Sequence, residues 1–540
     1  MNTKFQSQYI PYSQTGEFTK ITLDYINEAP ALKDFYEHPV NLDGIKSAII
    51  ERKKYNTNRK LLVERFTDQY KDFNDCDNVK ANIHALLDEN TFTICTAHQP
   101  NIFTGHLYFV YKILHTIKLA DLLKKELPEY NFVPVFFMGS EDADLEELNH
   151  IVIDGEKYVW GTKQTGAVGR MNVDDNLLKL IEKIAGRLSV EKYGNALIEL
   201  LKKCFKKKST VEEATFLFVH YLFKDYGLLV LLPDDPAFKR EMVSVFEDDI
   251  FNHTSSEIVN HTSDKLSENY KAQAYPREIN LFYLKDNLRN RIVSVEDHFV
   301  VHDTEITFSK EDIKKELKEH PERFSPNVIL RGLFQEMILP DVAWIGGGGE
   351  LAYWLQLIGL FKNYSIPYPV LVLRNSFLII DEKYKKLLQK LKLNAVELFK
   401  GKEILLNEII KRESKIVLNL EKEKKEFENI YKTIKEIVSN IDSTLIEHTS
   451  ALQTKHEKKL NALEKKMLRA EKRRFTDQKK QLNKIFSVLF PNDGLQERTE
   501  NFMSFYSKWG DDFFKILYES SLTLKSEFCI VEQVDEEKKK

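Results

Sequence analysis

Several features that define other protein classes are scarce or missing in this chain of 540 residues. It has four cysteines, Cys76, Cys95, Cys204 and Cys529, and no CxxC pair. This scarcity argues against a disulfide framework or a zinc ribbon and favours the reducing cytoplasm. The chain also lacks an apolar run of the ~20 residues that span a bilayer, and its N-terminus, MNTKFQSQYIPYSQ, has no basic stretch followed by an apolar one. We therefore expect a protein that is neither exported nor embedded in a membrane.

A strong excess of charge of either sign is also missing. Lysine and arginine number 79, and aspartate and glutamate number 83, which leaves a formal net charge of -4 at pH 7. No general attraction to nucleic acid or anionic lipid follows, so we expect neither as a partner. What the chain does have is length and 42% hydrophobic residues, enough for large packed cores in roughly two to four domains.

Short apolar runs alternate with amphipathic stretches from residue 91 to about 380. TFTICTA (91–97) and NFVPVFFM (131–138) read as buried strands, and the sequence between them has apolar residues at helical spacing. Further strands are expected in 227–235, 341–348 and 368–375. Buried strands separated by helices are typical of a parallel sheet with right-handed crossovers. The predicted fold class is therefore α/β, with a core at 91–380 that is interrupted by insertions at about 155–225 and 240–330.

The two ends of the chain differ from this core. Residues 1–90 carry no recognisable motif and are expected to form an N-terminal extension packed on the core. Residues 381–490 are rich in Lys, Glu, Leu and Ile, with apolar residues three and four apart, which indicates a coiled-coil helical domain. SNIDSTL (439–445) could turn one long helix back on another, and the narrow apolar stripe suits such a hairpin or a partner chain. Residues 491–540 are expected to return to the core.

The first predicted strand runs into TAHQPNIFTGHLYF (96–109), which places two histidines, a proline and a glycine at a strand-to-helix junction. Open α/β sheets bind ligands beyond the carboxyl ends of their strands, where helix N-termini present free N–H groups. His98 and His106 are candidate catalytic residues, because imidazolium stabilises negative charge and neutral imidazole accepts a proton. A purely structural role for both rings is the alternative. The same turn contributes the candidate binding residues Gln99, Pro100, Thr104 and Gly105.

The second strand is followed by GSEDADLEELNHI (139–151), in which five carboxylates crowd together. Such carboxylates repel one another unless a cation lies among them. One interpretation is a helix start, with Asp144 as N-cap and Glu147 at the third helical position. The other is a site for an ammonium group, in which Glu141 and Asp142 are candidate catalytic residues. Further candidate contacts in this segment are Asp144, Asn149 and His150.

A third predicted strand runs into GGGGELAYWLQL (346–357), where four glycines precede a predicted helix. Bare backbone amides at such a turn can hold a phosphate, although a Walker loop is excluded because its lysine and hydroxyl residue are missing. A flexible turn is the alternative interpretation. A fourth strand, at 368–375, ends in two polar residues that could reach the same cleft. The candidate binding residues here are Gly346, Gly347, Gly348, Gly349, Glu350, Tyr353, Trp354, Arg374 and Asn375.

Taken in order, HQPNIFTGH, GSEDADLEELNH and IGGGGELAYWLQL resemble the bacillithiol biosynthesis cysteine-adding enzyme family. The resemblance extends to FSPNVILRGLFQEMILPDVAWI, to the coiled-coil region and to LQERTENFMSFYSKWGDDFF near the C-terminus. It implies a Rossmann-like core similar to that of class I aminoacyl-tRNA synthetases, with inserted connective segments, and a coiled coil that supports a homodimer. It also implies a ligase that joins L-cysteine to the glucosamine amine of glucosaminyl malate.

The resemblance further implies a nucleotide site at the histidine turn. FTGH stands where the HIGH tetrad of those synthetases stands, with Phe103 in place of the first histidine and with Gly105 and His106 at the last two positions. The resemblance to the HIGH tetrad implies that the turn binds a phosphate group of the nucleotide or the group that leaves from it. ATP or ADP is the expected nucleotide. The chain departs from the family pattern at His106, Ala143 and Gly348, and no KMSKS-like lysine loop follows 368–375.

An amide-forming ligase is the leading functional hypothesis. Because a carboxylate is a poor electrophile, L-cysteine is expected to react as a nucleotide-activated acyl group with glucosaminyl malate. Two alternatives remain open, namely a nucleotidyltransferase acting on a small acid or sugar, and a non-enzymatic coiled-coil adaptor with a metabolite-binding core. No metal is predicted, because the spacing of His98, His106, His150 and Cys95 matches no closed zinc site.

Overall fold

The computed structural model describes residues 4–414, 416 and 418–534. These residues form two compact units. Unit 1 contains the described residues up to 379 and from 494 onward, and unit 2 contains those from 380 to 493. Unit 1 carries the central sheet and the candidate site, whereas unit 2 is built mainly from helices.

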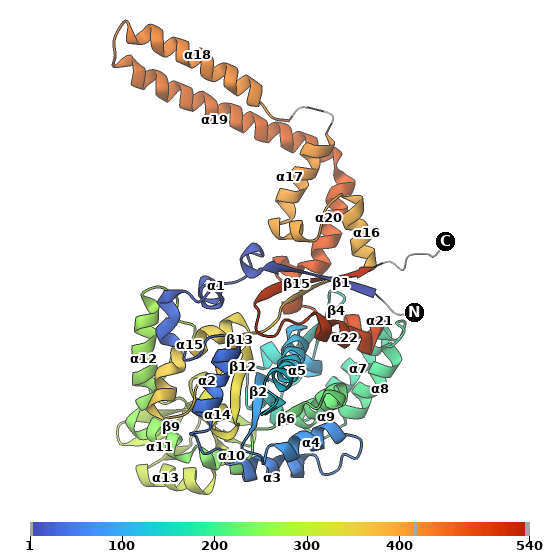
Figure 1. The fold of residues 1–540 in the computed structure, drawn as a ribbon, viewed down its shortest axis with the longest axis vertical. Helices are drawn as coiled ribbons and strands as arrows, with labels where there is room; N and C mark the ends of the chain where they lie inside the picture. Colours follow the sequence, from blue (N-terminus) through green and yellow to red (C-terminus); the bar gives the residue numbers. More distant parts are fainter. Residues whose placement is uncertain (1–3, 415, 417, 535–540) are drawn as a thin grey trace. The chain divides into compact units, whose positions relative to one another are not determined.

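A five-stranded parallel sheet lies at the centre of unit 1 (Figure 1). Its strand order is β13-β12-β2-β3-β6, and every neighbouring pair is parallel. The strands span Thr91–His98 (β2), Asn131–Met138 (β3), Leu229–Leu231 (β6), Asp341–Gly346 (β12) and Val370–Leu373 (β13). Each of them falls in a segment predicted as a strand, so the predicted α/β class with its parallel core is confirmed.

Helices bury the sheet, which explains why its strands lack polar alternation. α2 (Leu42–Arg52) and α5 (Tyr108–Glu126) pack apolar side chains against β2, β12 and β13 in one hydrophobic cluster. Residues four positions apart lie on one face of a helix and can point to the same core. The pairs that do so here are Ile45 and Ile49 in α2, and Leu119 and Leu123 in α5.

The connections between the sheet strands carry the additional elements. Between β3 and β6 the chain forms the antiparallel hairpin of β4 (His150–Ile153) and β5 (Glu156–Val159), and then α7 (Asp175–Leu188), α8 (Gly194–Cys204) and α9 (Val211–Phe223). Between β6 and β12 it forms α10 (Pro236–Glu241), α11 (Val243–Asn252) and α12 (Thr254–Ser267). The same connection forms an antiparallel sheet of order β10-β9-β8-β7-β11, in which β9 spans His298–Val301 and β10 spans Thr307–Phe308. The strands β7 (Leu281–Lys285), β8 (Leu288–Val295) and β11 (Phe324–Pro326) of that sheet contribute residues to the candidate site.

The first and last strands of the chain meet in a third sheet. β1 (Lys4–Pro11) pairs antiparallel with β15 (Glu527–Val534), and β14 (Phe377–Ile380) completes the sheet. The segment that precedes β15 contains η10 (Gln496–Arg498), α21 (Met503–Trp509) and α22 (Asp511–Ser520). This return of the chain to unit 1 places the C-terminal segment beside the central sheet, where it contributes to the candidate site.

Unit 2 contains the predicted long helices. α18 (Glu421–Ser439) and α19 (Leu445–Glu471) form a hairpin whose turn falls within the segment 439–445, as the sequence predicts (Figure 1). The unit also contains α16 (Glu382–Lys390), α17 (Lys402–Glu413) and α20 (Thr476–Leu489). In the part of the chain that the structure describes, no helix combines the length and apolarity needed to cross a membrane.

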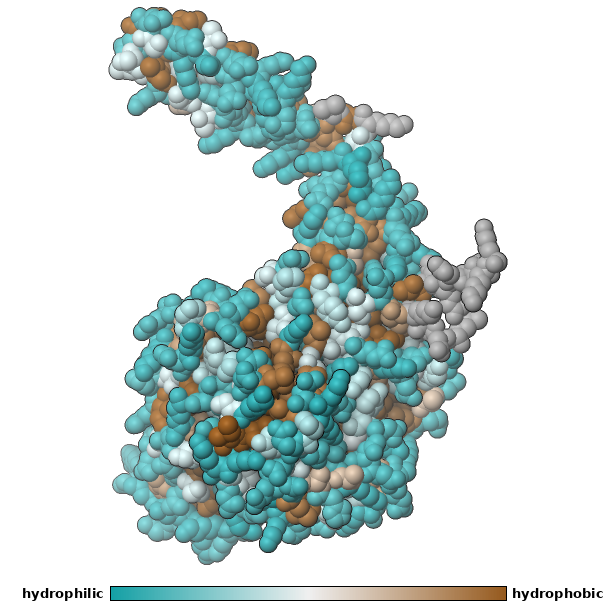
Figure 2. Space-filling model, in the orientation of Figure 1, coloured by the Kyte–Doolittle hydropathy of each residue, from teal (hydrophilic) through white to brown (hydrophobic). Residues whose placement is uncertain are grey.

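Polar and aromatic side chains contact one another between the two helices of the hairpin, whereas the sequence predicts a stripe of apolar side chains there. Tyr431 Oη and His456 Nδ1 share a hydrogen bond of 2.6 Å, Phe427 packs edge-on against the His456 ring, and Lys424 pairs with Glu464 at 2.7 Å. Four isoleucines of the stripe lie on the surface instead, namely Ile430, Ile434, Ile437 and Ile441, which are 53%, 37%, 55% and 73% exposed. Figure 2 shows hydrophobic side chains on the surface of this hairpin. One face of α18 is therefore apolar and uncovered within the hairpin.

Candidate active site

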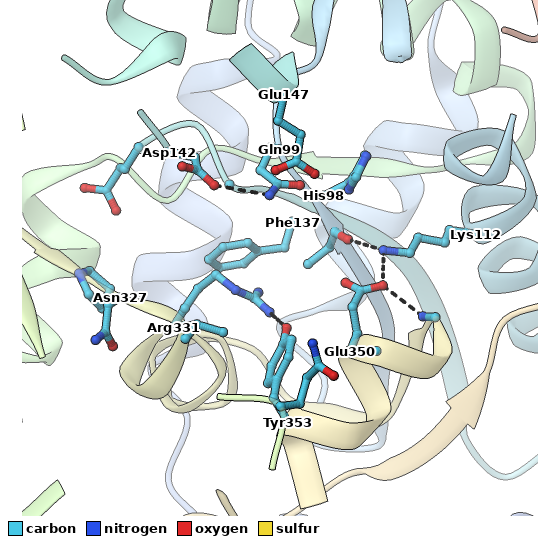
Figure 3. Close-up of a pocket in the computed structure, with 18 of the residues that line it drawn as sticks. His98, Gln99, Lys112, Phe137, Asp142, Glu147, Asn327, Arg331, Glu350 and Tyr353 are labelled. Carbon is cyan, nitrogen blue, oxygen red and sulfur yellow. Dashed lines mark hydrogen bonds and ion pairs between the residues drawn. The ribbon is translucent and has the colours of Figure 1, made fainter. Parts of the chain in front are cut away.

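A cavity of about 890 Å³ lies at the carboxyl ends of β2, β3 and β12, the edge at which the sequence predicts a ligand site (Figure 3). Its size is suitable for a small molecule. The structure brings together the predicted residues His98, Gln99, His106, Glu141, Asp142, Gly347, Gly348, Gly349, Glu350, Tyr353 and Arg374 in its wall. They come from loops far apart in sequence, because parallel strands end at the same edge of a sheet.

The turn after β2 has an unusual backbone that depends on Gly105. Phe103 and Thr104 have positive φ values of 50° and 73°, and Gly105 follows at φ 66° and ψ -129°. A Cβ atom at position 105 would lie 2.8 Å from Cβ of Asn101. Glycine is therefore required both for its backbone angles and for its lack of a side chain. The turn places His106 in the cavity wall, two residues before α5 begins.

The C-terminal segment braces this turn. Asn501 Nδ2 donates hydrogen bonds to the carbonyl oxygens of Phe103, at 3.1 Å, and of Gly105. Nδ1 of His106 lies 3.1 Å from the carbonyl oxygen of Thr499. Because a carbonyl can only accept, Nδ1 carries the proton and Nε2 is the free acceptor of the ring. The segment thus fixes both the turn and the tautomer of His106.

Burial keeps both candidate histidines neutral. The pKa of His98 lies well below its usual value of 6.5, first because the ring is buried and then because Lys112 is close. The pKa of His106 is lowered too, mainly by burial. Nε2 of His98 is buried and has no hydrogen-bond partner among the described residues. Of the two chemical roles considered for these rings, the neutral acceptor fits the structure better than the imidazolium.

The charge of Glu141 is balanced within the protein. Its carboxylate pairs with Lys239 of α10, and Lys239 also donates to the carbonyl oxygen of Phe324 at 2.8 Å. Lys239 is 0% exposed and Glu141 only 8%. A buried carboxylate needs such a cation, because removing an unpaired charge from water is costly. The ammonium group that Glu141 contacts in the structure is therefore that of Lys239.

Asp142 and Glu147 present the negative charge that remains for a ligand. Asp142 Oδ2 accepts a hydrogen bond from Gln99 Nε2 at 3.1 Å, and Glu147 lines the same cavity as Gln99 and His98 (Figure 3). Asp144 caps the short helix that follows by accepting from the N–H of Glu147 at 3.2 Å, as the helix-start interpretation predicts. Burial, together with Asp142 and Asp144, raises the pKa of Glu147. The loop therefore starts a helix and also supplies carboxylates to the cavity.

The glycine run lies at the N-terminus of α15 (Gly348–Asn363), with Gly347 as the N-cap. The Glu350 carboxylate accepts from the N–H of Gly347 at 2.8 Å and pairs with Lys112 of α5. Lys112 also donates to the carbonyl oxygen of Ala97 at 2.9 Å (Figure 3). The glycines line the cavity, and the first N–H groups of a helix have no acceptor within it. This helix start is therefore able to receive an anionic group.

Arg374 follows β13 and lines the cavity, but its charge is matched inside the protein. Its Nη2 pairs with Oε1 of Glu497 at 2.7 Å, and both side chains are buried. Its guanidinium lies 5.0 Å from the centroid of the Tyr108 ring. Arg374 thus links the central sheet to the C-terminal segment and is a positioning residue.

Other predicted site residues lie outside the cavity wall, namely Pro100, Thr104, Gly105, Asp144, Asn149, His150, Gly346, Trp354 and Asn375. Trp354 is fully buried, with its ring centroid 4.6 Å from that of Trp344. Gly346 makes room for the Trp344 ring, because a Cβ atom there would lie 2.0 Å from it. Nδ1 of His150 faces the carbonyl oxygen of Glu146 at 3.2 Å. The contacts of these three residues are with the protein itself.

Sequence reasoning did not single out several residues of the cavity wall. Lys112 and Arg331 each stand inside an otherwise apolar helical run, and a charge in such a run is a signal because buried charges are rare unless they are paired. No local sequence pattern indicates that the C-terminal segment contacts the turn after β2 and contributes Arg498 to the cavity wall. The wall residues of this kind are Tyr108, Lys112, Arg289, Arg331 and Arg498.

The fold and the cavity together define the class of protein. Within residues 4–414, 416 and 418–534, no group of three or more His, Cys, Asp or Glu side chains is arranged to hold a metal ion. The site instead combines neutral histidines, two carboxylates, a helix N-terminus and arginines at the carboxyl edge of a Rossmann-like sheet. These features are typical of an enzyme that acts on small, charged molecules.

Comparison with known proteins assigns the family. Residues 5–375 match the N-terminal Rossmann-like domain of bacillithiol biosynthesis BshC, and residues 377–533 match its C-terminal coiled-coil domain. The chain is 38% identical over 524 residues to a protein of Flavobacterium johnsoniae named "Putative cysteine ligase BshC", which covers 97% of this chain and 99% of that protein. Proteins of the same name from Flavobacterium psychrophilum and Christiangramia forsetii are each 37% identical, over 97% of this chain and 98% of their own.

The chain belongs to the BshC family, and the resemblance noted in its motifs is confirmed. It is an enzyme of the ligase class with a role in bacillithiol biosynthesis.

Proposed function

We propose that this enzyme joins the carboxyl group of L-cysteine to the amine of glucosaminyl malate and forms an amide bond. The observation that carries the proposal is the division of the cavity wall (Figure 3). Asp142 and Glu147 offer negative charge on one side, and the glycines at the start of α15 offer N–H donors on the other. The first set suits an ammonium group and the second an anionic group.

The amine of the acceptor must lose a proton before it attacks the acyl carbon. We assign orientation of the ammonium group to Asp142, which Gln99 holds in place at 3.1 Å. Glu147 is assigned as the proton acceptor, because burial, together with Asp142 and Asp144, raises the pKa of its carboxyl group and so favours proton uptake. The neutral ring of His98 beside them adds no positive charge that would repel the ammonium group.

The cysteine carboxylate has to be activated, and ATP or ADP is the nucleotide that we propose for this step. When bound, the nucleotide supplies a phosphate that converts the carboxyl oxygen into a leaving group. The glycine turn is a candidate phosphate site, because Gly347, Gly348 and Gly349 line the cavity at the start of α15 and carry no side chain that would cover their N–H groups. The residues of the chain would bind the phosphate oxygens through the first N–H groups of α15.

We further propose that the enzyme is a cytoplasmic homodimer. Ile430, Ile434 and Ile437 of α18 and Ile441, which follows the end of the helix, are exposed. They repeat at intervals of four, three and four, which is the spacing of a coiled-coil seam. A second copy of the chain presents the same stripe and would bury both. All four cysteines are buried and free, as is usual where thiols stay reduced.

The ligase proposal is tested by incubating the full-length protein with L-cysteine, glucosaminyl malate and either ATP or ADP, followed by mass spectrometry of the products. The expected product is the cysteinyl conjugate of glucosaminyl malate. Glu147→Gln is expected to slow its formation by roughly 10²–10⁴-fold, the usual contribution of a general base. Glu146→Gln is the matched control, because Glu146 lies in the same loop but outside the cavity wall.

Three outcomes would contradict parts of this proposal. If no conjugate forms with either nucleotide, the ligase assignment is wrong. If Glu147→Gln and Glu146→Gln both react at the wild-type rate, Glu147 is not the base. Exchange of labelled pyrophosphate into ATP without cysteine would indicate the alternative nucleotidyltransferase instead.

A further inference from the structure

Arg331 differs from Lys112, Lys239 and Arg374, the cations at the cavity that each pair with a carboxylate of the protein. It projects from α14 (Val328–Ile338) into the cavity wall, and its guanidinium lies 5.8 Å from the centroid of the Phe137 ring. Nη2 donates a hydrogen bond of 2.6 Å to the hydroxyl of Tyr353 (Figure 3). Nη1 is buried and has no hydrogen-bond partner among the described residues. The guanidinium therefore has donors that the protein leaves unused.

Four buried cations of unit 1 each form an ion pair with a different carboxylate, which offsets the cost of burying the charge. These pairs are Arg52 with Glu336, Lys112 with Glu350, Lys239 with Glu141, and Arg374 with Glu497. Arg331 forms no ion pair within the described part of the chain, and its hydrogen-bond partner Tyr353 is a neutral phenol whose pKa is raised by burial. Glu350 acts on Arg331 only at longer range, because its carboxylate is taken by Lys112.

A second guanidinium of the wall shares this feature. Arg289 of β8 stacks 3.9 Å from the Phe282 ring centroid, and its hydrogen bonds to Ser325 Oγ are long, at 3.3 and 3.4 Å. It too forms no ion pair among the described residues. Burial lowers its pKa, and the carboxylates of Asp142 and Glu141 act on its charge only at longer range. Arginine does not lose its proton in proteins. Arg498 of the wall also forms no ion pair among the described residues, but it is exposed to solvent, so Arg331 and Arg289 are the partly buried guanidiniums of the cavity that have no ion-paired carboxylate.

We infer that Arg331 binds a carboxylate of the acceptor substrate. This inference rests on the proposed function. In the proposed reaction the carboxyl group of L-cysteine is consumed, because it becomes the new amide. Both carboxylates of the malate moiety persist from substrate to product. A guanidinium that is kept free of internal partners therefore matches malate better than cysteine.

The assignment also gives the acceptor a direction in the cavity. Its amine lies at Asp142 and Glu147, and its malate end lies at Arg331. A charged group that is held at each end limits the poses of the sugar between them and brings the amine to one place. Arg331 is thus a specificity-determining residue for acceptors that carry a carboxylate.

The test measures binding to the full-length protein by calorimetry, with glucosaminyl malate and with methyl glucosaminide, which has the amine but no carboxylate. Arg331→Met is expected to weaken the binding of glucosaminyl malate roughly ten- to hundredfold, which is the range for the loss of a hydrogen bond to a charged group. The affinity for methyl glucosaminide is expected to stay unchanged. Arg331→Lys keeps the positive charge but lacks the planar guanidinium that can donate two hydrogen bonds to one carboxylate. It is therefore expected to restore part of the lost affinity. Arg277→Met, at an exposed arginine outside the cavity wall, is the control.

The outcomes separate this inference from the proposed function. If Arg331→Met and Arg331→Lys, shown to be folded by circular dichroism, bind both ligands as wild type does, the inference is wrong. It is also wrong if the wild-type protein binds glucosaminyl malate no more tightly than methyl glucosaminide, a comparison that does not depend on the variants being folded. A rise in KM for cysteine alone would also contradict it, because the bound carboxylate would then be that of cysteine. If carboxylate-dependent binding through Arg331 is found but no conjugate forms, the subsite stands and the ligase proposal fails.

Discussion

At the scale of single residues, the cavity is organised by which charges are matched inside the protein. Three of the predicted site residues are neutralised by ion pairs within the protein. Glu141 pairs with Lys239, Glu350 with Lys112, and Arg374 with Glu497. Buried pairs of this kind hold side chains in place, because separating them leaves a charge without water or a partner. The charges that remain for ligands are then few and belong to Asp142, Glu147, Arg331, Arg289 and the exposed Arg498.

Gly105 provides the sharpest residue-scale prediction. Gly105→Ala places a Cβ atom 2.8 Å from Asn101 at φ 66°, where side chains are strained. We expect the free energy of unfolding to fall by about 1–3 kcal/mol and ligation activity to fall with it, because the turn carries His106. Urea unfolding and the ligation assay measure the two effects.

Gly186→Ala is the matched control for this substitution. Gly186 lies within α7, has open space where its Cβ would be and has no positive φ. Alanine in a helix is expected to stabilise the protein by up to about 1 kcal/mol relative to glycine. If Gly105→Ala is as stable and active as Gly186→Ala, the turn does not need glycine.

At the scale of elements, the sequence predicts where the strands of the central sheet end. It does not predict which residues the helices contribute to the cavity wall. β2, β3, β12 and β13 are short apolar runs that end in polar or glycine residues, so both the strands and their terminal loops follow from local pattern. Arg331 stands on a helix whose pattern indicates only that one face is buried. Which of its residues faces the cavity depends on how the helix packs against the sheet.

The apolar face of α18 gives a prediction at this scale. Ile430→Glu combined with Ile434→Glu is expected to convert the proposed dimer to a monomer, because each isoleucine buried between two copies would contribute on the order of 1.5–3 kcal/mol. The helices should stay folded, since these side chains are exposed within the hairpin. Sedimentation velocity and circular dichroism measure the two results.

Lys432→Glu changes an exposed charge of the same helix and is the control for the double substitution. It is expected to sediment as the wild type does. A wild-type protein that is monomeric at micromolar concentration, or a double variant that remains dimeric, would refute the proposed dimer.

At the scale of the whole molecule, buried neutral histidines couple stability to pH. Burial lowers the pKa of both His115 and His220 to about 4, whereas both are near 6.5 in an unfolded chain. Between these values the unfolded state binds protons that the folded state does not. The free energy of unfolding is therefore fully retained above about pH 6.5 and falls as the pH drops toward 4.

His220→Phe tests this coupling. Both ring nitrogens of His220 are buried without a partner among the described residues, and the rings of Tyr70, Phe73 and Phe216 surround it. Phenylalanine fits such an environment and cannot be protonated. Between pH 7 and 4.5 the variant is expected to lose less stability than wild type, by up to about 3 kcal/mol, as measured by urea midpoints. Parallel pH profiles for the two proteins would contradict the prediction.

The amino-acid sequence by itself determined the parallel sheet, the helical hairpin and the edge at which the cavity lies. These features follow from patterns within a few residues, because apolar spacing selects strand or helix and glycine permits the turns. Only the tertiary structure decided which side chains face a ligand. Glu141 and Lys239 are 98 residues apart, and Asn501 and Phe103 are 398 apart. Such partners neutralise or brace site residues across space, and no local pattern records a contact that folding alone creates.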